Sequence, residues 1–201
     1  AVTDPLQHTT ATDYDAVGNA VVVTDPLGHR TTTQYDALDR ATTVTGPNND
    51  TTVVAYDAAG NAVKVIDPVG NVTTNVFDAA DRLTTVSMPG GGTHTYVYDA
   101  ADQEVGYTDA DGRHLTYAYD LNGNKTGESW LAASGGILRS LTYTYDNLGH
   151  LTGAADPNAT LTYGYDSGGQ LTSSGISGPG GLPTVTLSYG YDLAGNRTSV
   201  T

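Results

Sequence analysis

The chain has 201 residues, with 22 acidic and 8 basic side chains, a formal net charge of −14 and no cysteine. The electrostatic field of a chain with this negative charge repels phosphate backbones and anionic membrane surfaces, so nucleic acid is not an expected partner. The missing cysteines exclude disulfide frameworks, cysteine-based zinc sites and thiol nucleophiles. No apolar run approaches the ~20 residues of a membrane helix, so we expect no transmembrane segment.

An aromatic residue followed by aspartate recurs along the whole chain, with gaps of 21, 21, 21, 21, 21, 26, 20 and 26 residues. The nine pairs are Tyr14-Asp15, Tyr35-Asp36, Tyr56-Asp57, Phe77-Asp78, Tyr98-Asp99, Tyr119-Asp120, Tyr145-Asp146, Tyr165-Asp166 and Tyr191-Asp192. A fixed period is the signature of a repeat protein, whose repeats cannot bury their faces alone. We predict a single array over residues 1–201. Because the sequence begins and ends within a repeat, we expect it to be part of a longer chain.

A second turn signal lies between the aromatic-Asp pairs, as in Asp25-Pro26-Leu27-Gly28 and Asp67-Pro68-Val69-Gly70. Proline presets φ for a tight turn, aspartate bonds the backbone two residues on, and glycine closes the turn without steric cost. The phrase Asp57-Ala58-Ala59-Gly60-Asn61 provides the other turn, in which Gly60 or Asn61 suits a left-handed backbone. Each repeat is therefore two strands and two turns.

The segments between the turns, such as 19–24, 29–35, 40–45 and 71–77, are short and rich in Val and Thr, which is typical of β-strands. The predicted fold is all-β: an antiparallel β-hairpin meander of about 18 strands that coils into a spiral wall or shell. In the first half of the chain the phrase endings alternate between Gly-Asn and Asp-Arg, so the repeats pair there into 42-residue units, a pairing that fades after Asp102-Gln103. Four strands per unit also fit a propeller blade, which leaves a β-propeller-like fold as the alternative.

Side-chain alternation places the residue two before each aromatic on the same face. In the second half of the chain this residue is tyrosine: Tyr96, Tyr117, Tyr143, Tyr163 and Tyr189. The double tyrosine ladder either stiffens the sheet by cross-strand packing or forms a sugar-stacking surface. We favour the structural role, because packing requires regular repetition and binding does not.

Two insertions, near residues 126–140 and 173–185, account for the 26-residue gaps. The first contains Trp130, the only tryptophan, and the second is rich in Gly, Ser and Pro. We expect both as loops on the same rim, where function tends to concentrate. The candidate ligand surface is Trp130 with Tyr143, Tyr163 and Tyr189, although we favour Trp130 as a plug in the wall.

The sequence predicts no catalytic, cofactor or metal site. The five histidines form no His-Glu-x-x-His motif, and no phosphate-cradling glycine motif or Gly-x-Ser-x-Gly elbow is present. Asp109-Ala110-Asp111-Gly112 resembles the start of a calcium loop, but the later bidentate glutamate is missing and Asp109 falls at a turn position. The chain is therefore not expected to be an enzyme.

Phrases such as Tyr-Asp-Ala-Ala-Gly-Asn and Asp-Pro-Val-Gly at 21-residue spacing resemble the YD-repeat, or RHS-repeat, family over essentially the whole chain. The resemblance implies a hairpin strip that spirals into a large hollow shell. Bacterial members look like cocoons around a toxin that a self-cleaving aspartic-protease domain releases, and animal teneurins use a similar shell for adhesion. No counterpart of that protease segment exists here, so no catalytic residue carries over.

These observations predict a non-enzymatic scaffold, a wall segment of an extracellular or cell-surface RHS-type shell around a cargo such as a toxin. The structural residues are the aromatic-Asp pairs and the turn residues Asp25, Pro26, Gly28, Gly60, Asp67, Pro68 and Gly70. Nine repeats are few to close a cocoon, so further repeats or other copies are expected partners. The alternative is an adhesive or filament-forming surface module that binds glycans or neighbouring copies.

Overall fold

The computed structural model describes residues 1–178 and 184–201. These residues form β-strands and turns without any helix, and hence without a helix long and apolar enough to cross a membrane. They fall into two units, Ala1–His94 and Thr95–Thr201. Short Val- and Thr-rich segments between turn residues explain the strands, because branched side chains pack well on a pleated surface.

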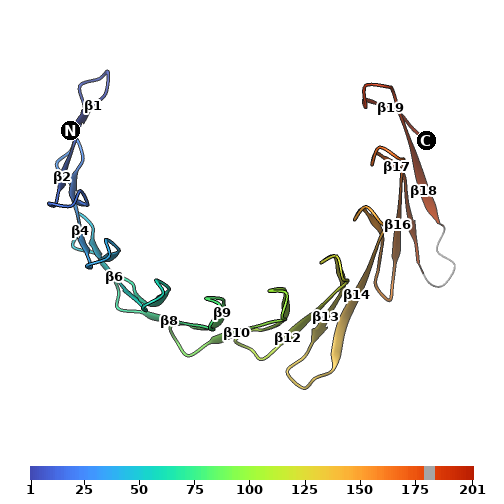
Figure 1. The fold of residues 1–201 in the computed structure, drawn as a ribbon, viewed down its shortest axis with the longest axis horizontal. Coiled ribbons are helices and arrows are strands. Elements are labelled where there is room, and N and C mark those ends of the chain that lie inside the picture. Colours follow the sequence, from blue (N-terminus) through green and yellow to red (C-terminus); the bar gives the residue numbers. More distant parts are fainter. Residues whose placement is uncertain (179–183) are drawn as a thin grey trace. The chain divides into compact units, whose positions relative to one another are not determined.

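Unit 1 is an antiparallel meander in which each strand pairs with the next one along the chain (Figure 1). Its strands are β1 (Val2–Thr3), β2 (Thr9–Tyr14), β3 (Ala20–Thr24), β4 (Arg30–Tyr35), β5 (Ala41–Thr45), β6 (Thr51–Tyr56), β7 (Ala62–Ile66), β8 (Val72–Phe77) and β9 (Leu83–Ser87). The predicted strands at 19–24, 29–35, 40–45 and 71–77 each begin one residue later than expected, because the first residue belongs to the turn.

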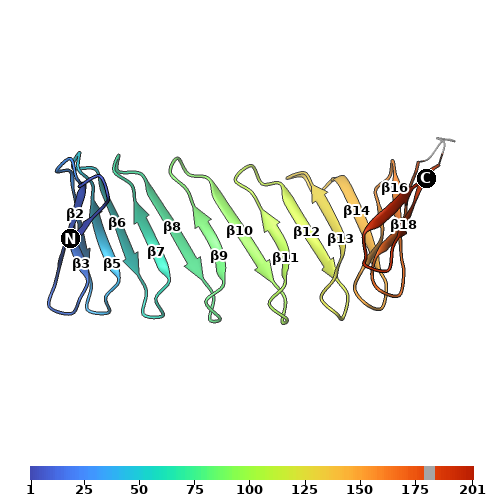
Figure 2. The ribbon, with the colours of Figure 1, turned by 90° about the horizontal axis from the view of Figure 1, so that it is seen from above.

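Unit 2 continues the same pattern of antiparallel neighbours (Figure 2). Its strands are β10 (Thr93–Tyr98), which begins at the boundary, β11 (Glu104–Thr108), β12 (His114–Tyr119), β13 (Lys125–Leu131), β14 (Ile137–Tyr145), β15 (Leu151–Ala155), β16 (Thr160–Tyr165), β17 (Leu171–Ser177), β18 (Val185–Tyr191) and β19 (Arg197–Val200).

The predicted all-β antiparallel hairpin meander is confirmed. The β-propeller alternative is wrong, because pairing runs without interruption from β1 to β9 and from β10 to β19. A propeller would break into separate four-stranded blades. The two strands per repeat and the tight turns follow from the turn chemistry of the sequence.

A β-bulge next to each aromatic-Asp pair bends the hairpin. Tyr56 pairs with Ala62 and Ala55 pairs with Lys64, so Val63 is the extra residue of the bulge. The same shift recurs in the other described hairpins that carry the pair. Bulges bend a strand and increase its twist, and in Figure 1 the turns beyond them hook to one side of the sheet.

No described residue is fully buried in either unit. Several strands have one half-buried face and one exposed face, as in β12, where Leu115, Tyr117 and Tyr119 are half-buried and Thr116 and Ala118 are exposed. Others, such as β9, β11 and β15, are half-buried along their whole length. We call the face that carries the aromatic residues the aromatic face. Within each unit this single layer is stabilised by its hydrogen-bonded ladders and by side-chain pairs on that face.

Candidate functional site

The aromatic-Asp turn is a five-residue loop built around the aspartate side chain. The Asp57 N–H donates to the Asn61 carbonyl (3.0 Å), and the Gly60 N–H donates to the Asp57 carbonyl (3.3 Å). The Asp57 Oδ1 also accepts from the N–H groups of Gly60 and Asn61, both at 2.9 Å. Gly60 has φ of +103°, so the left-handed position predicted for Gly60 or Asn61 belongs to Gly60.

The fifth turn residue carries a side-chain nitrogen donor that the sequence reasoning missed. It bonds the second carboxylate oxygen of the turn aspartate at 2.8–3.1 Å in eight aromatic-Asp turns. The donors are Asn19, Arg40, Asn61, Arg82, Asn124, His150, Gln170 and Asn196. His8 and His29 contact Asp4 and Asp25 in the same way at the other turns, so these histidines have structural roles.

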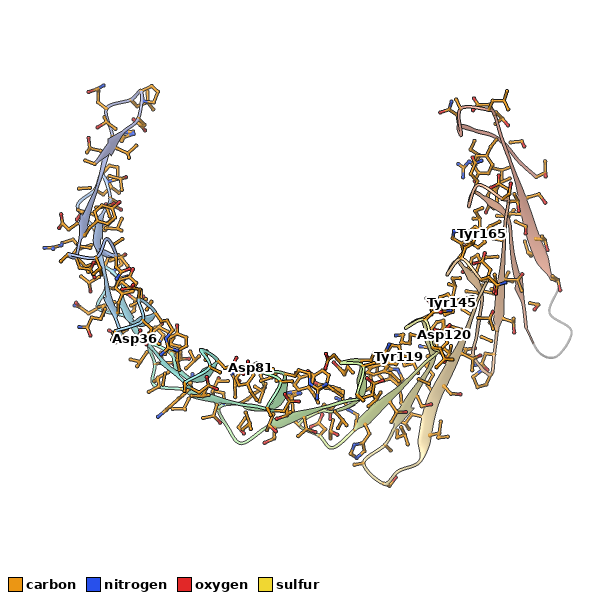
Figure 3. The ribbon with its side chains drawn as sticks, in the orientation of Figure 1. Asp36, Asp81, Tyr119, Asp120, Tyr145 and Tyr165 are labelled. Carbon is orange, nitrogen blue, oxygen red and sulfur yellow. The ribbon has the colours of Figure 1, made fainter. Side chains whose placement is uncertain are left out.

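The 42-residue period has a structural cause in unit 1. At the fourth turn position glycine alternates with Asp39 and Asp81, which adopt positive φ of 59°. Each of these aspartates accepts a hydrogen bond from the preceding hairpin, Asp39 from Asn19 and Asp81 from Asn61, both at 2.7 Å. Asp81, which lies in the turn between β8 and β9, is labelled in Figure 3. In unit 1, asparagine in one hairpin is therefore matched by aspartate in the next.

Arg40 makes the corresponding link forward from an Asp-Arg hairpin. Its guanidinium pairs with Asp36 at 2.7 Å, donates to the Asp57 carbonyl at 3.1 Å and lies 4.6 Å from the centroid of the Tyr56 ring. One side chain thus closes its own turn and contacts the next hairpin. Asn-type and Arg-type links alternate, which gives the period of 42.

In six repeats the tyrosine of the aromatic-Asp pair joins its hairpin to the one before. Its hydroxyl donates to the carbonyl of the residue six positions after the preceding aromatic, at 2.9–3.1 Å. The pairs are Tyr35–Ala20, Tyr56–Ala41, Tyr119–Glu104, Tyr145–Lys125, Tyr165–Leu151 and Tyr191–Leu171. Figure 3 shows Tyr119, Tyr145 and Tyr165 on the same side of unit 2.

Hydrogen bonding lowers the pKa of most turn aspartates. The backbone N–H of Asn61 is the main cause of the lowered pKa of Asp57, and the side chain of Asn124 is the main cause for Asp120. Donors stabilise the ionised carboxylate. The acidic charge of the chain is therefore largely part of its turns.

Trp130 lies in a strand, which corrects the predicted rim loop. The first insertion lengthens β13 and β14, and the turn between them is still tight, with the Ala132 N–H bonded to the Gly136 carbonyl at 2.8 Å. Trp130 pairs with Leu115 on one side and Arg139 on the other. It therefore shares the aromatic face, where it is 43% exposed. The tip of the second insertion, residues 179–183, lies outside the described residues.

The predicted ligand residues share a face but do not form one pocket. Tyr143, Tyr163 and Tyr189 stand on β14, β16 and β18, in three successive hairpins. Tyr163 lines a cavity of about 250 Å³ with apolar neighbours that include Leu161 and Ile176. Trp130 lines a separate cavity of about 190 Å³. Their role as a ligand surface stays a prediction.

A charged network crosses the aromatic face beside Trp130. The indole Nε1–H donates to Glu128 Oε1 at 2.6 Å, and the Lys125 ammonium donates to Glu128 Oε2 at 2.7 Å. The ammonium also lies 5.2 Å from the Tyr117 ring centroid and 5.5 Å from that of Tyr143. The bond from Lys125 lowers the pKa of Glu128, whereas partial burial raises the pKa of Glu104 on β11.

Sequence reasoning passed over this network. The signal was available, because Glu104 and Glu128 are the only two glutamates in the chain and both fall within strands rather than at turn positions. Asp109, by contrast, behaves as the turn aspartate that its position predicts: it accepts from the N–H groups of Asp111 and Arg113 and pairs with the Arg113 side chain. Among the described residues, no group of three or more histidine, aspartate or glutamate side chains is placed to hold a metal ion.

The family model for the RHS repeat matches four tandem segments of the chain, residues 14–51, 56–93, 98–129 and 145–182. Together these segments cover more than half of the sequence. The chain belongs to the RHS repeat family. The interval between the third and fourth RHS segments, 130–144, falls on the lengthened hairpin of Trp130, so this hairpin departs from the family pattern. No curated protein matches the chain.

Solved structures support the RHS fold. The crystal structure of TcdB2–TccC3 aligns with a TM-score of 0.68 at 18% identity, over 89% of this chain and 12% of that chain. TcdB2–TccC3–Cdc42 gives 0.60 at 18% identity, over 95% and 15%. A Photorhabdus luminescens Tc holotoxin pore with mutated TccC3 gives 0.61 at 17%, over 95% and 14%. The present chain thus spans about 15% or less of the length of each matched chain. At this sequence identity, the structural similarity shows a shared fold.

Proposed function

We propose that the chain is a non-enzymatic section of the wall of a secreted RHS-type shell that encloses a polypeptide cargo such as a toxin. The observation that carries the proposal is the tyrosine bond from one hairpin to the next, which recurs in both units. The side chains that the repeat fixes in place serve turns and links between hairpins. A layer of this kind is suited to a structural role rather than to catalysis.

Two further observations support a wall. The RHS family model matches in tandem segments, and the structures of similar fold include a Tc holotoxin pore. The chain corresponds to a small fraction of those chains, which agrees with one section of a larger enclosure. Encapsulation and secretion are what the family resemblance implies for the parent protein.

The test is electron microscopy of the parent protein together with protease protection of its cargo. A shell predicts closed hollow particles and a cargo that resists protease until the particle is opened. Long regular fibres with a digestible cargo would reject the shell and favour the filament-forming alternative.

A matched pair of variants connects the test to the proposed links. The triple change Tyr145→Phe, Tyr165→Phe and Tyr191→Phe removes three hydroxyl bonds between hairpins. We expect it to make the cargo protease-sensitive at lower temperature than in the parent. The control, Tyr143→Phe with Tyr163→Phe, removes hydroxyls of the second tyrosine row and should leave protection unchanged. Equal effects of the two sets would show that the hydroxyl links do not hold the wall.

A second candidate function is ligand binding by an adhesive surface module, which the exposure of Trp130 favours. Tryptophan and tyrosine are enriched among the residues that contribute most to binding at protein interfaces. A glycan array probed with the parent and with Trp130→Ala and Tyr163→Ala tests this function. A blank array for a correctly folded parent rejects glycan binding.

A further inference from the structure

We infer that unit 2 carries a two-point receptor for an extended polypeptide segment, in which Glu104 binds a basic side chain and the Trp130 cavity binds an apolar one. The inference rests on the proposed function, because the segment would belong to the cargo. It narrows that cargo to a polypeptide with basic and apolar residues at a defined spacing.

The apolar point is the cavity of about 190 Å³ on the aromatic face. Its lining includes Tyr107, Leu115, Trp130 and Leu138, together with Asp109 and Arg113. Binding sites for drug-sized molecules are larger, about 300–1,000 Å³, so this cavity suits a single side chain. Trp130 and Leu138 are 43% and 64% exposed, so apolar surface is open to an incoming group.

The indole that forms one wall of the cavity is held before any partner arrives. Its Nε1–H is bonded to Glu128, and Glu128 is fixed in turn by the Lys125 ammonium. An aromatic residue with a locked orientation loses little conformational entropy on binding. Trp130 is therefore suited to act as an anchor rather than as a mobile surface residue.

The cationic point is Glu104, and the neighbouring hairpin shows what such a site accepts. There Glu128 holds the Lys125 ammonium between the Tyr117 and Tyr143 rings. Glu104 is the other strand glutamate on this face, and its carboxylate makes no hydrogen bond or ion pair with the described residues. Carboxylates flanked by aromatic rings attract ammonium and guanidinium groups.

Three tyrosines, Tyr107, Tyr117 and Tyr119, lie near enough to Glu104 to interact with its charge. The Tyr119 hydroxyl donates to the Glu104 main-chain carbonyl at 2.9 Å. Burial is the main cause of the raised pKa of Tyr107, Tyr117 and Tyr119, and the Glu104 charge adds to it. Partial burial in turn raises the pKa of Glu104 itself. A bound cation would compensate this negative charge. The net charge of −14 favours basic partners over acidic ones.

The two points lie on one face at a spacing that a polypeptide can match. The bulge in β11 places Glu104 opposite Tyr98, and Tyr107 opposite Tyr96 and Leu115, so both β11 residues face the same side. Three residues along a strand span about 10 Å. A polyproline II segment projects every third side chain in the same direction at about 9 Å intervals. A basic residue three positions from an apolar one therefore fits both points.

The test uses the 201-residue chain and synthetic peptides, read by fluorescence of Trp130, the only tryptophan. The probe has a Lys-Pro-Pro-Phe core, and its controls are Glu-Pro-Pro-Phe and Lys-Pro-Pro-Ser. We expect saturable change in Trp130 emission with the probe and at least tenfold weaker binding of each control. Equal binding of all three peptides, or no emission change from a natively folded chain, overturns the inference.

Single-residue variants test which residue forms each of the two binding points. Glu104→Gln keeps the shape and removes the charge, so it should bind Lys-Pro-Pro-Phe and Glu-Pro-Pro-Phe equally. Leu138→Ala should remove the preference for Phe over Ser. Asp13→Asn, a change of a strand carboxylate in unit 1, is the matched control and should retain both preferences. Circular dichroism before titration shows whether each variant is folded, and full discrimination by a folded Glu104→Gln chain rejects Glu104 as the cation site.

The outcome is separable from that of the proposed function. Protease protection of cargo in the parent particle tests the wall, and peptide titration of this chain tests the receptor. Protected cargo without peptide discrimination keeps the wall and rejects the receptor. If the chain discriminates between the peptides but the cargo is not protected, the two-point site is supported and its role in holding cargo is rejected.

Discussion

Asn75 makes the hydrogen bond that Phe77 cannot make. Its Nδ2 donates to the carbonyl oxygen of Ala62 at 2.8 Å, the position that a tyrosine hydroxyl would reach in this repeat. In six other repeats the tyrosine itself supplies this donor. Asn75 stands two residues before Phe77 on the same strand, β8, and so faces the same side. The link between hairpins is thus kept when its usual donor is lost.

We predict that Asn75→Ala lowers the free energy of unfolding by about 1 kcal/mol, the usual net value of one such bond. In a Phe77→Tyr background the new hydroxyl can reach the same carbonyl, so the cost should fall below half. A double-mutant cycle in urea measures this coupling. Thr33→Ala, at the same repeat position before Tyr35, is the control and should show no coupling to Tyr35→Phe. Additive effects of Asn75→Ala and Phe77→Tyr would contradict the substitution of one donor for the other.

The regular part of this fold is predictable because the turn chemistry is local. Asp57 and Gly60 set their turn through bonds within five residues, so the strands and their facing follow directly. The bond from Asn75 to Ala62 joins residues 13 apart in different hairpins, and no local signal marks it. The 42-residue alternation was visible, but its cause, an Asn19 side chain that reaches Asp39, needed the structure.

The candidate site was predictable only in part, for a similar reason. Alternation placed Tyr143, Tyr163 and Tyr189 on one face, because a strand has a period of two. Trp130 was assigned to a loop because an insertion can lengthen either a turn or its strands, and the sequence does not distinguish these. Glu104 was missed because the contrast that singles it out is structural: within residues 1–178 and 184–201 no ion pair involves Glu104, whereas Glu128 is paired with Lys125.

Gly60→Val should destabilise the array by more than 1 kcal/mol. Gly60 has φ of +103°, a conformation that branched side chains avoid. A Cβ there would meet nothing closer than Arg40 at 3.8 Å, so the cost comes from the backbone rather than from a clash. Ala59→Val, one residue earlier in the same turn, is the control and should change the urea midpoint little. An unchanged midpoint for Gly60→Val would refute the turn assignment.

Glycine substitution of a residue with a left-handed backbone conformation should have different effects on stability at two turns. Asn49 has φ of +62°, so Asn49→Gly relieves strain and should stabilise the protein by up to about 0.5 kcal/mol. Asp81 has φ of +59° but also accepts the bond from Asn61. We expect Asp81→Gly to be neutral or destabilising, since the lost bond offsets the relieved strain. Thermal melts of both variants decide the matter, and equal stabilisation would mean that the Asn61 bond contributes nothing.

Acid should unfold the array over a pH range set by its turn aspartates. Hydrogen bonds lower the pKa of twelve of them, including Asp57, Asp67 and Asp120, below the ordinary value of 3.8. A carboxyl with a lower pKa in the folded state stabilises that state above its unfolded pKa, and this stabilisation is lost as pH falls through the folded pKa. Circular dichroism should therefore show a steep loss of sheet below about pH 4. Asp120→Asn should make the dependence shallower, and an acid profile that is flat to pH 2 would contradict the role of the turns.

Lys125→Met should make the fluorescence of Trp130 sensitive to pH in the acid range. Lys125 is the main cause of the lowered pKa of Glu128, with Trp130 second. Removing the ammonium leaves a partly buried carboxylate that keeps only the indole donor, so its pKa must rise. The indole bond to Glu128 changes when that carboxyl is protonated, and Trp130 emission should report the titration with a midpoint higher than in the parent.

Arg139→Met is the matched control for Lys125→Met. Arg139 lies opposite Trp130 and is the last and smallest named cause of the lowered Glu128 pKa, so its loss should move the midpoint less. A pH titration of emission, with urea unfolding run alongside, separates titration from loss of structure. Identical midpoints in the parent and in Lys125→Met would show that Lys125 does not control Glu128, and the Glu128 site would then no longer serve as the internal example of how this face holds a cation.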